Sequence, residues 1–178
     1  PNNPNIVYAG SYSGEITRFN KETGQTLQMT AYPHYTEGTN MTELKYRFQW
    51  NFPIVISEHA PDTMYITSQY VHRSTDGGFT LEIISQDLTT NDPEFLDRIP
   101  GGPIQYDATG VEVYSSIFAF AESPHQQGEL WAGSDDGLVH ISRNGGESWN
   151  EITPDNMPKN GTVNAIELSE HNPGTAYI

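Results

Sequence analysis

Short alternations of apolar and polar residues recur along the chain, and each is bounded by turn-forming residues. In residues 138–142, Val139 and Ile141 alternate with Leu138, His140 and Ser142, as in a strand with two different faces. Helical periodicity is almost absent. The exception is residues 90–99, where an N-cap at Asp92 and a first position at Pro93 predict one short helical turn. The pattern therefore predicts an all-β protein.

The strands belong to a repeat with turn-rich openings at residues 1, 57, 123 and 169. Each opening leads into a strand that carries an aromatic residue, at Tyr8, Tyr65, Trp131 and Tyr177. The separations are 57, 66 and 46 residues, and the shortest is close to one four-stranded propeller blade of roughly 40–50 residues. We therefore expect about three four-stranded blades of a larger β-propeller. The blade units would span approximately residues 1–56, 57–122 and 123–168, with the start of a further blade at 169–178.

Three blades cannot make an ordinary ring, because propellers close with about 4–8 blades. We expect the remaining propeller blades to come from a longer chain. An open array and an oligomer that completes the ring are the alternatives.

Two segments break the repeat, at residues 34–53 and 92–116. We call them the first and the second insertion. Insertions in repeat proteins tend to collect on one face, which is often the binding face. These segments are where we expect a functional site.

Two glycine-rich turns, residues 74–81 and 142–149, occupy the same phase of the repeat. Hydroxyl and Asx side chains can bond the turn backbone, glycine supplies positive φ, and a large apolar residue then folds back between strands. Because the pattern recurs, we expect it to be architectural and not catalytic. Its positions are Ser74, Asp76, Gly78 and Leu81 in the first turn, and Ser142, Asn144, Gly146 and Trp149 in the second.

These turns resemble the Asp-box, or BNR repeat, of sialidases, propeller-type xyloglucanases and the sortilin propeller. Each copy departs once, since Leu81 stands in place of the usual Trp and Asn144 in place of the usual Asp. The stretches "LWAGSDDGLVHISRNGGESWNEITP" and "KYRFQWNFPI" are similar to segments of bacterial proteins with sortilin-like propeller domains, loosely labelled glycosyl hydrolases. The resemblance implies an Asp-box propeller. It does not imply one activity, because such proteins include enzymes and binders.

Four carboxylates are candidates for chemistry or binding. Glycoside hydrolysis needs two carboxylates about 5–10 Å apart, and Asp107 and Glu112 in the second insertion are the catalytic candidates. An exposed acidic loop is the alternative reading of that pair. Asp135 and Asp136 are binding candidates, but adjacent side chains on a strand end point apart. A role in capping turn amides is therefore favoured for them.

Aromatic residues and one arginine in the first insertion also suggest a binding site, because sugar-binding grooves combine aromatic platforms with charged rims. Arg47 and Trp50 are the binding candidates here. If this segment is a strand, alternation places Tyr46, Phe48 and Trp50 on one face, and we expect that face to be mostly buried.

Histidines and acidic residues do not indicate a metal site. His59, His125 and His171 share one phase of the repeat, which favours a structural role for each, and the other three histidines lack ligand spacing. No cofactor is predicted. Structural calcium at Asp135 and Asp136 remains possible, although no EF-hand-like loop is present.

The charge, the apolar content and the cysteine count of the chain exclude several classes of partner and of chemistry. Eight basic residues stand against 23 acidic ones, a net charge of −15, so the basic footprint of a nucleic-acid binder is missing. No apolar run is long enough to span a membrane, so no membrane insertion is expected. The absence of cysteine excludes disulfides and thiolate chemistry. The acidity favours a secreted or periplasmic location.

Two functional hypotheses follow. The first is a non-catalytic or unassigned propeller module that binds a protein, peptide or glycan through its inserted loops. The second is a fragment of a propeller-type glycoside hydrolase, xyloglucanase- or sialidase-like, with carboxylates partly outside this chain.

Overall fold

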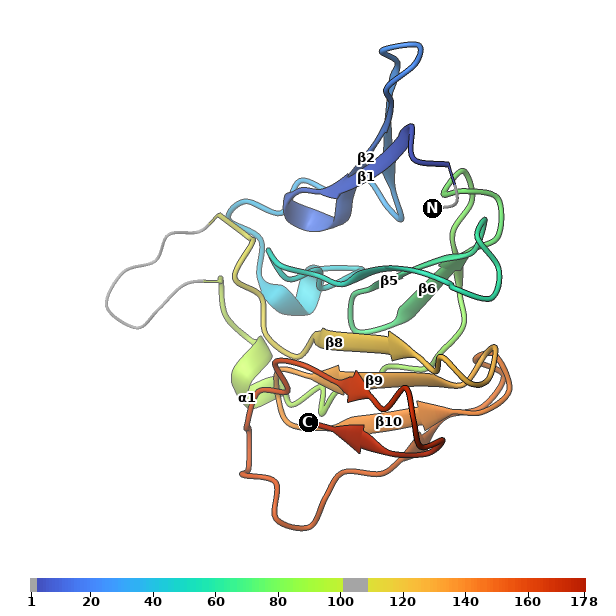
Figure 1. The fold of residues 1–178 in the computed structure, drawn as a ribbon. Helices are drawn as coiled ribbons and strands as arrows, with labels where there is room; N and C mark the ends of the chain where they lie inside the picture. Colours follow the sequence, from blue (N-terminus) through green and yellow to red (C-terminus); the bar gives the residue numbers. More distant parts are fainter. Residues whose placement is uncertain (1–2, 101–108) are drawn as a thin grey trace.

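The structure contains four antiparallel sheets; in Figure 1 the first three follow one another from the blue end of the chain, and the small fourth sheet, in red, is drawn over the third. The structure is a computed structural model and describes residues 3–100 and 109–178. The first sheet has the order β1-β2-β3, built from Ile6–Gly10, Glu15–Asn20 and Thr26–Thr30. The second has the order β4-β5-β6-β7, built from Ile54–Ile56, Met64–Thr67, Val71–Ser74 and Glu82–Ile83.

The third sheet has the order β11-β10-β9-β8, where β8 is Ile117–Glu122, β9 Leu130–Ser134, β10 Val139–Ser142 and β11 Asn150–Glu151. The fourth pairs β12, Glu167–Leu168, with β13, Ala176–Tyr177. These sheets confirm the all-β class predicted from the hydrophobic pattern. The strands β4 and β8 stand at the ends of the predicted units 1–56 and 57–122, but each pairs with strands of the following unit.

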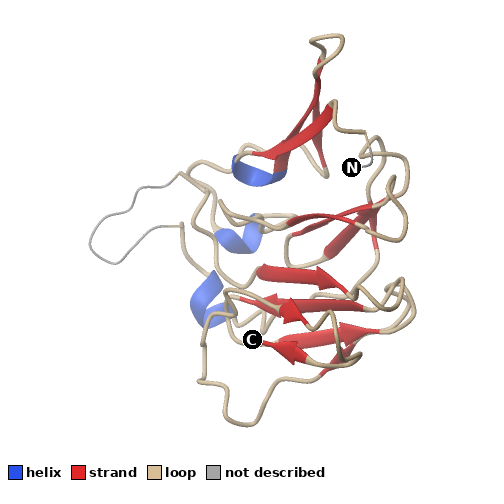
Figure 2. Cartoon of the chain, viewed as in Figure 1, coloured by secondary structure: helices blue, strands red, loops and turns tan. Residues whose placement is uncertain are grey.

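Helical structure in the described residues is limited to three short turns, which lie along one side of the sheets (Figure 2). They are η1 (Tyr12–Gly14), η2 (Met41–Glu43) and α1 (Pro93–Leu96). The predicted turn of helix is confirmed in α1, where the Asp92 side chain accepts a hydrogen bond from the backbone N–H of Glu94 at 3.0 Å. No helix in the described part of the chain is long and apolar enough to cross a membrane.

The strand register repeats from sheet to sheet. In the first three repeats, the aromatic residue pairs with a residue of the strand that follows it. Tyr8 pairs with Arg18, Tyr65 with Arg73, and Trp131 with Ile141. The strands β5, β9 and β10 of the second and third sheets are buried at every position, whereas β1 of the first sheet is mostly exposed.

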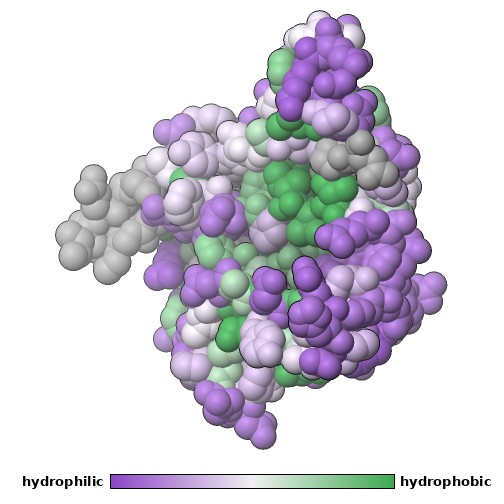
Figure 3. Space-filling model, in the orientation of Figure 1, coloured by the Kyte–Doolittle hydropathy of each residue, from purple (hydrophilic) through white to green (hydrophobic). Residues whose placement is uncertain are grey.

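The core lies between successive sheets. One apolar cluster joins the first and second sheets through Ile16, Met29, Met64 and Ile66. A second joins the second and third sheets through Tyr65, Val71, Leu130 and Ala132, among others. A third lies between β8, β10 and the segment before β12, with Ala119, Val139 and Val163. On the face drawn in Figure 3, apolar side chains gather in the middle, where the first sheet approaches the second.

Candidate functional site

The two insertions pack against each other on the side of the sheets where the short helices lie (Figure 1). The backbone N–H of Trp50 donates to the carbonyl of Val111 at 2.9 Å, and that of Met41 donates to the carbonyl of Arg98 at 3.0 Å. The Gln49 amide donates to the carbonyl of Val113 at 2.6 Å. Segments that are far apart in sequence thus form one layer, which we call the insertion face.

Apolar side chains from both insertions give the insertion face a small core of its own. It consists of Met41, Leu44, Leu96 and Val113, all at most 5% exposed, with Tyr114 packed against it. Full burial of such a side chain contributes about 1.5–3 kcal/mol. The layer is therefore held by packing as well as by hydrogen bonds.

Two glycines permit close approach of the pieces that build this face. Gly110 has φ +71° and lies against the backbone of Thr36, where a Cβ atom would collide with the Thr36 carbonyl. Gly14 in η1 has φ +76° and lies against the ring of Phe48. Glycine alone adopts this backbone region without strain and leaves the space free. Gly110 thus joins the two insertions, and Gly14 joins η1 to the first one.

Arg47 is buried beneath the insertion face. Its Nε donates to the Ser115 carbonyl at 2.8 Å, and its Nη2 lies 2.9 Å from a carboxylate oxygen of Asp87 and 3.1 Å from the Thr89 hydroxyl. Its backbone N–H donates to the Gln69 side chain at 2.7 Å. A buried guanidinium needs such partners to offset its desolvation. The structure therefore places Arg47 as an anchor that joins the first insertion to the second insertion and to the loops of the second sheet.

Asp135 and Asp136 are also buried and point to different partners. Asp135 accepts hydrogen bonds from the backbone N–H and the hydroxyl of Ser116, at 2.9 and 3.0 Å. Asp136 accepts from the backbone N–H and the hydroxyl of Thr90, at 2.9 and 2.7 Å. Burial raises the pKa of Asp135 to about 6, against the opposing effect of the Ser116 hydrogen bonds. Both carboxylates fix the ends of the second insertion to the β9–β10 turn.

The expectation that Tyr46, Phe48 and Trp50 share one buried strand face is wrong. Residues 44–53 are not a strand, so the period-2 alternation does not apply. Phe48 is buried and stacks on His72 with ring centroids 5.4 Å apart, and Tyr46 is half-buried. Trp50 is 57% exposed on the insertion face.

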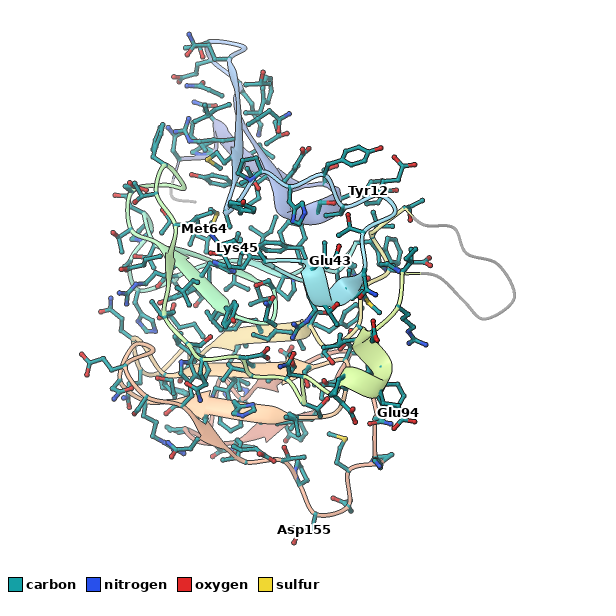
Figure 4. All side chains as sticks on the ribbon, turned by 180° about the vertical axis from the view of Figure 1, so that it is seen from behind. Tyr12, Glu43, Lys45, Met64, Glu94 and Asp155 are labelled. Carbon is teal, nitrogen blue, oxygen red and sulfur yellow. The ribbon has the colours of Figure 1, made fainter. Side chains whose placement is uncertain are left out.

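A pocket of about 490 Å³ opens where η1 meets the first insertion and residues 109–111 of the second insertion. Tyr12 and Tyr35, 59% and 75% exposed, stand in its wall with Glu15 and Glu37. Its other lining residues are mostly small and polar: Ser11, Ser13, His34, Thr36, Thr109 and Val111. Figure 4 shows Tyr12 beside η1, on the side of the molecule that also carries Glu43 of η2.

A second hollow of about 350 Å³ adjoins this pocket, since both are lined by Ser13, Glu15, His34 and Tyr35. It extends past Tyr32 toward the end of β3. We call these two adjoining hollows together the tyrosine pocket. It combines flat aromatic rings with hydroxyl and carboxylate groups.

Hydrogen bonds hold the wall of the tyrosine pocket. The Tyr35 hydroxyl donates to a carboxylate oxygen of Glu37, and the hydroxyls of Ser13 and Thr36 lie 2.8 Å apart. The hydrogen bond and the negative charge of Glu37 raise the pKa of Tyr35. The Tyr35 ring thus stays a neutral donor beside a carboxylate. Amphipathic rings of this kind are well suited to ligands that are partly polar.

Of the residues predicted from sequence, the structure brings Trp50 and Glu112 to the insertion face and places Arg47, Asp135 and Asp136 beneath it. Glu112 is exposed and follows Val111, which lines the tyrosine pocket. Asp107 lies outside the described residues. The pattern of residues did not single out Tyr12, Tyr35 or Glu37. Two signals in the sequence could have found them: the "YPHYTE" stretch at 32–37 is rich in aromatics within a polar loop, and the β1–β2 connection carries a tyrosine.

The two glycine turns make the same hydrogen bonds. The hydroxyl of Ser74 accepts from the N–H of Gly78 at 2.8 Å, and that of Ser142 accepts from the N–H of Gly146 at 2.9 Å. Asp76 and Asn144 each accept from the backbone N–H four residues on, at 2.9 and 3.0 Å. These bonds, led by the one from the Thr80 backbone, lower the pKa of Asp76 to about 2. The polar side chains that the pattern emphasises thus form hydrogen bonds within their own turn.

The apolar residue after each turn reaches a neighbouring sheet. Leu81 packs in the cluster between the first and second sheets. Trp149 is buried between the second and third sheets, and its Nε1 donates to the carbonyl of Ile84 at 2.8 Å. The turns therefore link sheets and lie away from the tyrosine pocket.

No group of three or more His, Asp or Glu side chains in residues 3–100 and 109–178 is arranged to hold a metal ion. The carboxylates of Asp135 and Asp136 are occupied by Ser116 and Thr90.

No protein-family model matches the chain, and no curated protein matches it. Solved structures resemble it in fold. An auxiliary nutrient binding protein from Bacteroides thetaiotaomicron VPI-5482 superposes with a TM-score of 0.53 and 13% identity, over 93% of this chain and 40% of its own. The computationally designed Ika4 protein superposes with a TM-score of 0.50 and 14% identity, over 94% of this chain and 76% of its own. At these identities the likeness concerns the all-β fold alone.

Proposed function

We propose that this chain is part of a β-propeller that binds a carbohydrate in the tyrosine pocket of its insertion face. The sheets would be successive blades. The repeated register, the paired hydrogen bonds of the glycine turns and the apolar clusters between sheets support this proposal, because blades repeat radially and pack face to face. The two glycine turns would be the Asp-boxes of the second and third blades.

The strand pairing also supports further blades from a longer chain. By register, β1-β2-β3 corresponds to β5-β6-β7, and the hairpin β12-β13 corresponds to β4-β5 and β8-β9. The first sheet thus has three strands and the fourth has two where the middle sheets have four. A closed ring of about 4–8 blades would complete both sheets.

The observation that carries the ligand proposal is the composition of the tyrosine pocket. Tyr12 and Tyr35 expose aromatic faces within a depression that also presents hydroxyls and the carboxylates of Glu15 and Glu37. Sugars have apolar C–H faces that stack on aromatic rings, and hydroxyls that need hydrogen-bond partners. Ligand pockets combine such apolar surface with a few placed polar groups. A saccharide satisfies both features at once, and binding an external glycan would suit the secreted or periplasmic location proposed for this acidic chain.

A glycan array followed by titration calorimetry tests this function. We expect the folded protein to bind at least one class of oligosaccharide, and Tyr35→Ala or Tyr12→Ala to weaken binding about tenfold because a stacking surface is lost. Tyr177→Ala is the matched control, since Tyr177 is 67% exposed on β13 and lies outside the pocket. Absence of glycan binding by the folded protein would overturn the proposal, as would equal affinities of Tyr35→Ala and the control.

The hydrolase alternative can be tested on the same ligands. If the protein releases shortened oligosaccharides from a bound glycan, and Glu112→Gln abolishes this release, the chain belongs to a hydrolase and not to a binding module. Binding without product release supports the binding module.

A further inference from the structure

The walls of the tyrosine pocket carry negative charge. Glu15 stands at the start of β2, and Glu37 follows Tyr35 in the first insertion. No lysine or arginine lines either hollow within the described residues. The whole chain carries a net charge of −15. An anionic ligand would therefore meet repulsion here, whereas a cation would be attracted.

Two tyrosine rings in and next to the tyrosine pocket, Tyr32 and Tyr46, already contact an ammonium group of the protein itself. The Nζ atom of Lys45 lies 4.2 Å from the centroid of the Tyr32 ring and 5.3 Å from that of Tyr46. Tyr32 lines the smaller hollow. A cation within about 6 Å of a ring centroid is attracted by the negative face of the ring. The other exposed rings of the pocket, Tyr12 and Tyr35, offer the same chemistry, and no lysine or arginine of the described residues lies over either of them.

A carboxylate next to such a ring strengthens the attraction. The Tyr35 hydroxyl donates a hydrogen bond to a carboxylate oxygen of Glu37, so the ring and the carboxylate are held next to each other. Hydrogen bonds between a carboxylate and an ammonium are charge-assisted and about twice as strong as neutral ones. The Tyr35 ring offers a cation–π contact to a primary ammonium, and the Glu37 carboxylate offers it a charge-assisted hydrogen bond.

We propose that the tyrosine pocket selects sugars that carry a free amino group, with the ammonium attracted by the carboxylates of Glu15 and Glu37 in the pocket wall and the sugar face stacked on Tyr12 and Tyr35. This inference rests on the proposed carbohydrate-binding function and names its ligand class. N-acetylated sugars lose the charge and keep the stacking surface. Uronic acids carry the opposite charge.

Titration calorimetry with three oligosaccharides of equal length tests the selection: oligomers of glucosamine, of N-acetylglucosamine and of a uronic acid, at mildly acidic pH. We expect the glucosamine oligomer to bind about tenfold more tightly than the N-acetylated one, because one charge pair is added. Its affinity falls as salt is raised, while that of the N-acetylated oligomer changes little. The uronic acid oligomer binds most weakly.

Variants separate charge from stacking. Glu37→Gln and Glu15→Gln each lower the affinity for the glucosamine oligomer by about fivefold and leave that for the N-acetylated oligomer unchanged. Tyr35→Ala lowers both. Glu147→Gln, in the second glycine turn, removes the same charge away from the pocket and is the matched control.

The possible negative results distinguish a failure of the amine selection from a failure of the carbohydrate-binding function. Tight binding of the N-acetylated or uronic acid oligomer, or a glucosamine affinity unchanged in both glutamine variants, overturns the amine selection while the carbohydrate function stands. No binding of any oligosaccharide by the folded protein overturns the carbohydrate function. Binding of a lysine-rich peptide without binding of any sugar overturns the saccharide ligand and assigns the pocket to peptides.

Discussion

The Nε2 atom of His59 lies 2.8 Å from the carbonyl oxygen of Ser123, which is 64 residues away. The same contact recurs one repeat later, where Nε2 of His125 lies 2.9 Å from the carbonyl oxygen of Ser169. Each histidine sits two residues after the serine that opens its own repeat, and each reaches the opening serine of the next. These contacts therefore join successive sheets through their equivalent turns.

Replacing His59 by Ala removes this link, and we expect the free energy of unfolding to fall by about 0.5–1 kcal/mol, the net value of one hydrogen bond. His171→Ala is the matched control. It shares the phase, but its exposed side chain has no partner among the described residues, so its loss changes stability by less than about 0.5 kcal/mol. Urea denaturation measures both. Equal effects of the two variants would show that the His59 contact contributes nothing.

Trp149→Leu reproduces the residue found naturally in the first glycine turn, at Leu81. The Trp149 indole donates to the Ile84 carbonyl and packs between the second and third sheets. Leucine fills less of that space and leaves the carbonyl without its donor. We expect a loss of about 2–3 kcal/mol, measured by urea denaturation. An unchanged midpoint would mean that the two turns are equivalent in spite of their different side chains.

Acid sensitivity should involve His72. Burial between Tyr46 and Phe48 lowers its pKa to about 4 from an ordinary value of 6.5. The unfolded chain therefore binds more protons between these values, so the stability contribution is complete above about pH 6.5 and is lost as pH falls toward 4. At about 1.4 kcal/mol per pKa unit, the loss is on the order of 3 kcal/mol.

His72→Gln tests this pH dependence, because glutamine keeps a polar group within reach of Ser68, the partner of His72 at 2.8 Å. We expect the difference in unfolding free energy between pH 7 and pH 4 to be smaller in the variant than in the original protein. The raised pKa of Asp135 acts in the opposite direction in this range and is common to both proteins. Parallel pH profiles would contradict the assignment to His72.

Gly110→Ala should separate the two insertions. A methyl group at this position meets the Thr36 carbonyl, and φ of +71° strains any residue with a side chain. We expect a loss of about 1–3 kcal/mol together with weaker ligand binding, since Thr36 and Thr109 line the tyrosine pocket. Gly24→Ala is the control: it has φ +71° but no atom within 4 Å of an added Cβ, so it carries the strain without the collision. Equal ligand affinity in both variants would show that this junction does not shape the pocket.

Local chemistry predicted much of the fold. The alternation at Val139 and Ile141, the cap at Asp92 and the glycine turns each depend on residues close in sequence, and each element forms where the pattern indicated it. The prediction for Trp50 was wrong, because alternation in "KYRFQW" looked like a strand. There the backbone instead bonds across to the second insertion at Val111. Tertiary contacts overrode the local preference.

The hydrophobic and polar pattern of the sequence did not predict the tyrosine pocket. Its walls come from residues 11–15, residues 30–37, Thr109 and Val111, and no local rule states that these segments meet. The meeting depends on close approaches at Gly14 and Gly110, which are visible only when the partner atoms of Phe48 and Thr36 are placed. The placement of both insertions on one face was expected. The sequence did not predict which side chains the two insertions present on that face.

Amide chemical-shift mapping during titration with the best-binding oligosaccharide tests the central claim most directly. We predict that the largest shifts cluster at residues 11–15, 34–37 and 109–111, and that about tenfold more oligosaccharide is needed to produce them in Tyr35→Ala but not in Tyr177→Ala. Shifts confined instead to the groove between β4, β8 and β12, which is lined by Val55, Phe120 and Leu168, would contradict the assignment of the ligand site to the tyrosine pocket.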